Sequence, residues 1–143
     1  MKSKVTRLVE KNDKIVRAIT LLRDRETCRI CGRTPGKDGV ILHYHHAVKT
    51  KGSSFQLRFD SRNCITLCAG CHFKVHNDSS LVWVDHWRAI FRQLIPIPIE
   101  EDLIIKHNTG TLKRNIGSMQ DLKPELENEL QHLKDTAISY AYS

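Results

Sequence analysis

The sequence contains no apolar run that approaches the roughly 20 residues needed to cross a bilayer, so we expect no membrane-spanning helix. Its start, MKSKVTRLVEKNDK, has no apolar core and no small-residue cleavage site, which predicts a cytoplasmic protein without a secretory signal. There is no glycine-rich phosphate loop, internal repeat or low-complexity tract. With 143 residues the chain is too short for a large two-domain cofactor enzyme, and its 40% apolar and 27% charged residues are typical of a globular domain.

The net charge of +7 comes from the first half of the chain. Residues 1–76 contain 16 of the 23 lysines and arginines but only 6 of the 16 acidic residues, whereas residues 77–143 carry a small acidic excess. A basic half joined to a mildly acidic half indicates a surface that faces a polyanion. The charge alone favours nucleic-acid binding and a merely solvated basic face about equally.

Four of the five cysteines form two C-x-x-C pairs, Cys28/Cys31 and Cys68/Cys71. Two such pairs are typical of a tetrahedral four-cysteine zinc site. The 36 residues between them exceed the commonest zinc-ribbon spacing, so we expect a structured insertion there. Disulfides are disfavoured because no secretory signal is present and Cys64 is left over. We expect Cys64 to pack as a small buried apolar group.

Five of the eight histidines lie between residues 43 and 76: His43, His45, His46, His72 and His76. His72 and His76 are four apart on a predicted helix, so they share a face that can hold one metal ion. Since four thiolates already complete a zinc site, a second ion is implied, and the His45-His46 pair is the obvious source of a further ligand. Adjacent strand residues face opposite ways, so one of the pair can bind the ion while the other serves as a general base.

Hydrophobic periodicity predicts helices over residues 4–25, 80–94 and 122–137. For the third helix we expect Asp121 as the cap and Pro124 in the first turn. Residues 99–117 favour no single element.

Strands are predicted by β-branched and aromatic residues at 40–48 and, more weakly, at 55–59 inside the basic loop 49–62. Residues 63–76 predict a short strand, the second cysteine pair and the start of a helix. Lysines and arginines of the basic loop are the expected clamp for a charged substrate: Lys49, Lys51, Arg58 and Arg62.

Three stretches, CRICG, LHYHHAV and RNCITLCAGCHFKVH, lie between Cys28 and His76. Together they resemble an HNH endonuclease of the zinc-stabilised ββα-metal type, over 49 of the 143 residues. The resemblance implies an α+β fold, with a small treble-clef-like ββα-metal core at 28–78 that holds structural zinc. A basic N-terminal helix at 1–27 and a C-terminal helical extension at 79–143 would wrap this core. LRFDSRN also resembles the phage NinG-type recombination endonucleases, which suggests a phage or mobile-element protein in a bacterial host.

The activity implied by this resemblance is metal-dependent hydrolysis of phosphodiester bonds in DNA. His46 matches the general base, and Asn63 matches the residue that buttresses the loop and orients the base. The family's catalytic divalent metal would be held by His45, His72 and His76. The structural zinc would be held by Cys28, Cys31, Cys68 and Cys71. An all-histidine ligand set adds no negative charge, so among Mg²⁺, Mn²⁺, Ni²⁺ and Zn²⁺ we expect the softer ions to be preferred.

Two other functions remain open at this point. A non-catalytic zinc-knuckle module that binds DNA or RNA would explain the cysteines and the charge, but it leaves the histidines without a role. An inactive scaffold would use the apolar stripe of residues 122–137 to bind a partner. A homodimer through that stripe is compatible with the sequence but is not indicated by it.

Overall fold

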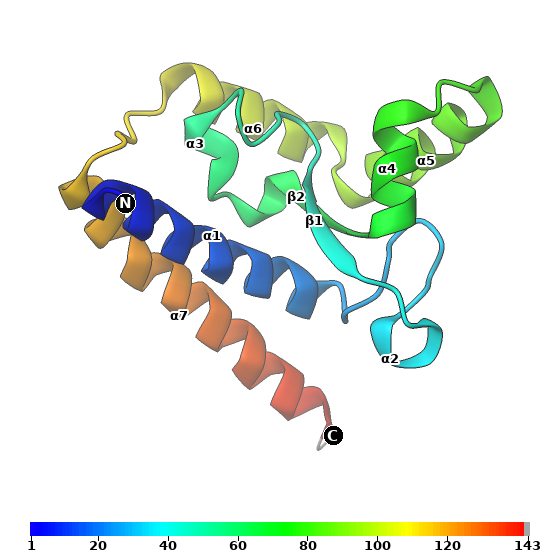
Figure 1. The fold of residues 1–143 in the computed structure, drawn as a ribbon, viewed down its shortest axis with the longest axis horizontal. Helices are drawn as coiled ribbons and strands as arrows, with labels where there is room; N and C mark the ends of the chain where they lie inside the picture. The colour runs from blue at the N-terminus through cyan, green and yellow to red at the C-terminus, as the bar shows by residue number, and fades with distance from the viewer. Residues whose placement is uncertain (142–143) are drawn as a thin grey trace.

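A computed structural model describes residues 1–141, and it shows a mostly helical α/β fold around a two-stranded sheet. In chain order the elements are α1 (Lys4–Arg23), α2 (Pro35–Asp38), β1 (Leu42–His46), α3 (Phe55–Arg58), the 3₁₀ turn η1 (Ser61–Asn63), β2 (Cys64–Cys68), α4 (Ala69–Asn77), α5 (Leu81–Leu94), α6 (Ile97–Thr109) and α7 (Ile116–Ala141). Figure 1 shows α1 and α7 side by side on one flank of the sheet and α4 and α5 on the other. Among the residues described, no helix is both long and apolar enough to cross a membrane.

The strands β1 and β2, which α3 and η1 separate in the chain, form a compact strand–strand–helix unit with α4. The two strands pair antiparallel, with Leu42 opposite Cys68 and His46 opposite Cys64. β2 is buried along its whole length, and α4 begins directly after it. The alternation of a strand places His43 and His45 on the face of β1 that is turned toward α4. The strand predicted at 40–48 and the strand–helix sequence predicted at 63–76 are both confirmed.

The helices outside this unit pack onto it through two apolar clusters. One cluster joins β2 to α5 and α6 through Leu67, Phe91 and Leu103. The other lies between α1 and α7, and its buried members include Val16 and Leu126. The apolar stripe of α7 is therefore covered by α1 of the same chain.

The structure corrects two local expectations and assigns one region that the sequence left open. Residues 55–59 form a turn of helix, not a strand, because Ser54 caps it and the rings of Phe55 and Phe59 pack edge to face one helical turn apart. The region 99–117, which favoured no single element, is mostly helix α6. Helix α7 starts at Ile116, before the expected cap Asp121.

The start of α7 is fixed by a different side chain from the one expected. Asn115 accepts a hydrogen bond from the Ser118 backbone N–H at 2.8 Å, which is the contact of an N-cap. Pro124 consequently lies inside the helix and not in its first turn. The helices predicted at 4–25 and 80–94 are confirmed, with ends shifted by one or two residues.

Candidate metal centre and cleft

The four cysteines of the two C-x-x-C pairs converge on one point, although 36 residues separate the pairs. Their sulfur atoms all lie within 4.8 Å of one another, and none forms a disulfide. Cys28 and Cys31 sit on a tight turn that Gly32 completes at φ 75°, a conformation that an L side chain rarely adopts. Cys68 ends β2 and caps α4, where its sulfur accepts the Cys71 backbone N–H at 3.4 Å.

The electrostatics of this cluster favour a bound cation. Burial and the neighbouring Cys28 raise the pKa of the Cys71 thiol, and burial likewise raises the pKa of Cys31. Burial also acts to raise the pKa of Cys28, but backbone hydrogen bonds outweigh it and lower the value. Four thiolates this close repel one another unless a cation neutralises them, and four thiolates are the donor set that tetrahedral zinc prefers. The cluster could therefore hold a zinc ion.

A second group of metal-ligating side chains lies on the face of the sheet covered by α4. His45 from β1 and the pair His72 and His76 from α4 each bring a ring nitrogen to within 4.8 Å of the others. Burial, together with the imidazoles of His72 and His76, lowers the pKa of His45 to about 3. Neutral imidazole is the form that ligates a metal, so this trio could hold one ion.

His43 lies outside the trio but touches it. Its Nδ1 is 2.9 Å from Nδ1 of His72, and the two rings meet edge to face. One nitrogen of this pair must carry the proton, and the contact engages Nδ1 of His72. It leaves Nε2 of His72 available to a metal ion. Sequence reasoning counted His43 in the cluster but gave it no role.

His46 lies on the opposite face of β1 from His45. Its Nε2–H donates to the Arg58 carbonyl at 3.1 Å, because a carbonyl can only accept. Nδ1 of the neutral ring therefore carries the free lone pair. Burial lowers the pKa of His46, and the nearby Lys51 ammonium lowers it further.

Asn63 is fully buried and holds the chain that follows β1. Its side-chain oxygen accepts the backbone N–H groups of Val48 at 2.8 Å and Lys49 at 3.2 Å. Its amide nitrogen donates to the Lys49 carbonyl at 2.9 Å, while its own carbonyl accepts from Ala47. These are loop-buttressing contacts of the kind that the resemblance implies for Asn63.

Three of the four basic residues expected to bind phosphate form ion pairs with carboxylates of the same chain. Arg58 forms two hydrogen bonds with the buried carboxylate of Asp13, at 2.9 and 2.7 Å. Lys51 approaches the same carboxylate at 3.3 Å but keeps 45% of its side chain exposed. Arg62 is held in a similar two-bond contact by Asp60. All three side chains thus have a carboxylate partner inside the protein, and Arg58 is the most buried of them, at 17% exposed against 43% for Arg62 and 45% for Lys51.

A cleft of about 510 Å³ is lined by the metal trio, that is His45, His72 and His76, and by His46. Its other lining residues include His43, Tyr44, Lys51 and Arg17. Arg17 comes from α1, and sequence reasoning assigned it no part in the site. Only the helical period could have indicated it, because Arg17 lies one turn from the buried Asp13 that anchors Arg58.

Comparisons of this chain with protein families, curated proteins and solved structures found no match.

Proposed function

We propose that this protein is a metal-dependent DNA endonuclease of the HNH, or ββα-metal, type. One observation carries the proposal. The histidine trio His45, His72 and His76 lines the same cleft as a fourth histidine, His46. The hydrogen bond from Nε2–H of His46 to the Arg58 carbonyl leaves its Nδ1 free to accept a proton. A group that could hold a cation and a candidate proton acceptor line one cavity, and hydrolysis of a phosphodiester uses both, which supports the proposal.

Each group of residues at the cleft has a separate role in the proposed hydrolysis. A divalent cation on the histidine trio would neutralise the scissile phosphate and the leaving oxygen. His46 accepts the proton of the attacking water at Nδ1, while Nε2–H stays on the Arg58 carbonyl and keeps the ring oriented. Asn63 holds the loop after β1, so the backbone that directly follows His46 is fixed.

Structural zinc at the four cysteines would position the metal trio. The strand–strand–helix unit is too small to bury a large apolar core, and small domains of this kind depend on a metal for stability. Cys68 and Cys71 flank the start of α4, which carries His72 and His76. Zinc at that turn would therefore hold the helix that supplies two of the three ligands.

Basic residues that line the cleft, such as Lys51 and Arg17, or adjoin it favour a polyanionic substrate. Lys51 is 45% exposed at the rim, and Lys49 lies on the adjoining loop that Asn63 clamps. A non-catalytic nucleic-acid-binding module would need these charges and the zinc cluster but not the histidine trio.

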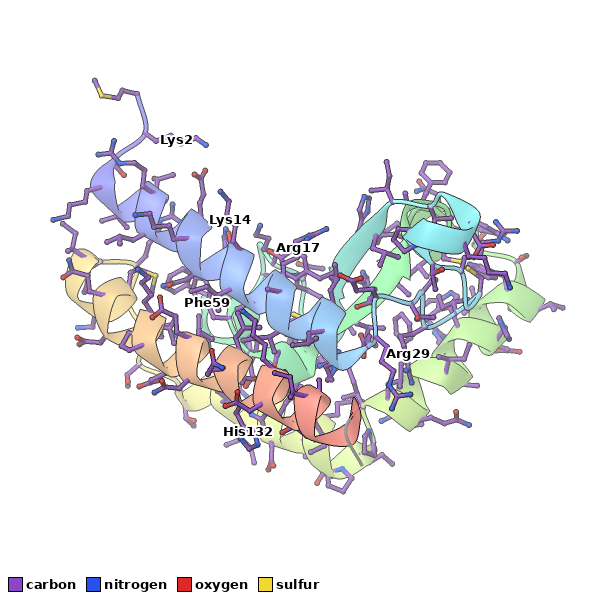
Figure 2. All side chains as sticks on the ribbon, turned by 90° about the horizontal axis from the view of Figure 1, so that it is seen from below. Lys2, Lys14, Arg17, Arg29, Phe59 and His132 are labelled. Carbon is purple, nitrogen blue, oxygen red and sulfur yellow. The ribbon has the colours of Figure 1, made fainter. Side chains whose placement is uncertain are left out.

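Plasmid cleavage tests the proposal. Supercoiled DNA is incubated with the protein in Mg²⁺, Mn²⁺, Ni²⁺ or EDTA, beside His46→Ala and a matched control, His132→Ala, whose histidine lies on α7 away from the sheet (Figure 2). We expect metal-dependent nicking that falls by about 10²-fold or more in His46→Ala and stays unchanged in His132→Ala, since general bases contribute about 10²–10⁴-fold. Cleavage that survives His46→Ala, or a protein that binds DNA and holds one zinc but never cuts, would overturn it.

A further inference from the structure

Helix α1 carries a continuous basic face that the cleft does not account for. Lys4, Arg7, Lys11 and Lys14 recur every three or four residues and are all exposed. Together with Arg17, we call these residues the basic stripe. The period of a helix places them along one side of α1. At about 1.5 Å per residue, the stripe from Lys4 to Arg17 is about 20 Å long.

The fold leaves this side of α1 uncovered. α7 packs on the other side, against buried residues such as Val9 and Val16. Within residues 1–141, the ion pairs found include none with a residue of the basic stripe. The carboxylates of the same helix are used elsewhere, since Glu10 pairs with Lys2 at 2.7 Å and Asp13 points inward to Arg58.

The stripe ends at the cleft. Arg17 lines the cavity with the metal trio and His46, and its guanidinium reaches the Leu42 carbonyl of β1 at 3.4 Å. Figure 2 shows Lys14 and Arg17 on the side of α1 that faces away from α7, with Lys2 on the segment before the helix and β1 beyond Arg17. The positive face and the histidine cleft thus form one surface.

The chemistry of the stripe identifies its partner as a nucleic-acid backbone. A membrane-surface helix exposes an apolar face beside its lysines, but the apolar face of α1 is buried against α7. Proteins that hold single strands stack bases on aromatic side chains, and α1 contains no Phe, Tyr or Trp. A row of cations without base-reading groups matches the evenly spaced phosphates of a duplex, which rise about 3.4 Å per base pair along each strand.

We propose that the basic stripe of α1 binds the sugar–phosphate backbone of a DNA duplex over roughly six base pairs and leads that strand past Arg17 into the cleft. The inference rests on the proposed function for its substrate, but the binding itself requires no catalysis. It predicts affinity that does not depend on base sequence and that falls steeply with salt.

The experiment compares two charge-matched triple variants of the full chain. Arg7→Gln/Lys11→Gln/Lys14→Gln removes the middle of the stripe, and Arg33→Gln/Lys37→Gln/Lys134→Gln removes three exposed cations elsewhere. Binding to a labelled 30-base-pair duplex is measured by fluorescence anisotropy between 50 and 200 mM salt, without added divalent metal. We expect the stripe variant to bind about 10²-fold more weakly at 0.1 M salt and the slope of log K against log salt to become shallower by about 2.7, since each phosphate contact contributes about 0.9.

The control variant is expected to keep the wild-type slope. Equal slopes for the two variants would overturn the proposal, and so would a tighter complex with the single strand than with the duplex. His46→Ala is expected to bind the duplex as the wild type does. If the wild type binds through the stripe but never cuts, the nuclease proposal fails while the backbone-binding surface stands, so the two failures are distinguishable. In an active protein, the stripe variant is expected to raise KM and leave kcat within about twofold.

Discussion

The Asp13→Asn substitution tests whether α1 positions the proposed base. Asp13 is buried, and it receives two hydrogen bonds from Arg58, whose backbone carbonyl accepts the His46 Nε2–H. Asparagine keeps the size and one acceptor oxygen but loses the charge. The variant therefore separates the ion pair from simple packing.

The stability cost can be worked from the contacts. Removing one partner of a buried ion pair costs about 3–5 kcal/mol. The side chains of Asp13 and Arg58 are 10% and 17% exposed, so the pair lies close to that regime. The remaining amide oxygen offsets part of the loss, and Lys51, whose side chain is 45% exposed, adds little. We expect the free energy of unfolding to fall by about 2–3 kcal/mol, measured by urea denaturation at fixed free zinc, because bound zinc itself stabilises the native state.

The effect on catalysis is expected to be separate from the effect on stability. Without the Asp13 carboxylate, Arg58 and its backbone carbonyl are held less firmly, so the His46 ring is oriented less well. We expect kcat to fall by about 10-fold, while KM changes little. The matched control is Asp24→Asn on the same chain segment. Asp24 is equally buried, and it accepts two hydrogen bonds from Arg23, at 3.1 and 3.0 Å, and one from the Thr66 backbone N–H at 2.9 Å. None of these partners bonds a histidine ring.

Asp24→Asn should therefore lose stability without losing kcat. If Asp13→Asn also keeps its full kcat in plasmid nicking, the argument that Asp13 positions His46 through Arg58 is refuted. A stability loss below about 0.5 kcal/mol would refute the estimate for the buried pair.

Three further outcomes are expected. Cys68→Ser should abolish stoichiometric zinc in elemental analysis and lower the melting temperature sharply, because the zinc site supplies folding free energy; a folded, zinc-loaded variant would contradict the cluster. His43→Ala should weaken the binding of Mn²⁺ by about 10–100-fold in calorimetry, since His43 fixes the ring of His72; an unchanged affinity would deny it that role. Hydrogen bonds from Arg62 and Lys106 overcome the opposing effect of burial and lower the pKa of Asp60 to about 2. Asp60→Asn should therefore cost about 2 kcal/mol at neutral pH, and the cost should shrink as pH falls from about 4 through about 2; a cost independent of pH in urea titrations would contradict this.

The candidate metal-ligating residues were predictable from the sequence because their spacing is local. His72 and His76 share a helix face by period alone, and two C-x-x-C pairs define a zinc-type donor set before any fold is known. The structure brings both groups together as expected. Cys64 likewise lies buried as predicted, where burial raises the pKa of its thiol to about 12.

The basic residues were harder to assign because their partners are distant in sequence. Arg58 in a basic loop suggests a phosphate clamp, yet the carboxylate that receives it is 45 positions away on α1. The sequence weakly favours a strand at 55–59, but the local Ser54 cap and the ring contact between residues 55 and 59 favour a helical turn. Ion pairing and capping depend on what the fold brings near, and a periodic pattern does not contain that information.

Cys68 has three structural roles: it is the last residue of β2, the N-cap of α4 and a member of the cysteine cluster. Oxidation or chelation at that one turn would release the strand end and the first turn of α4 together. The apolar contact between α1 and α7 belongs to a separate cluster and does not pass through this turn. If zinc occupies the cluster, its removal would therefore disturb the geometry of the histidine trio in a local unfolding event while the longest helices stay packed. Under the proposed function, oxidation of the thiols or loss of zinc would then switch off the cleft without any ligand entering it.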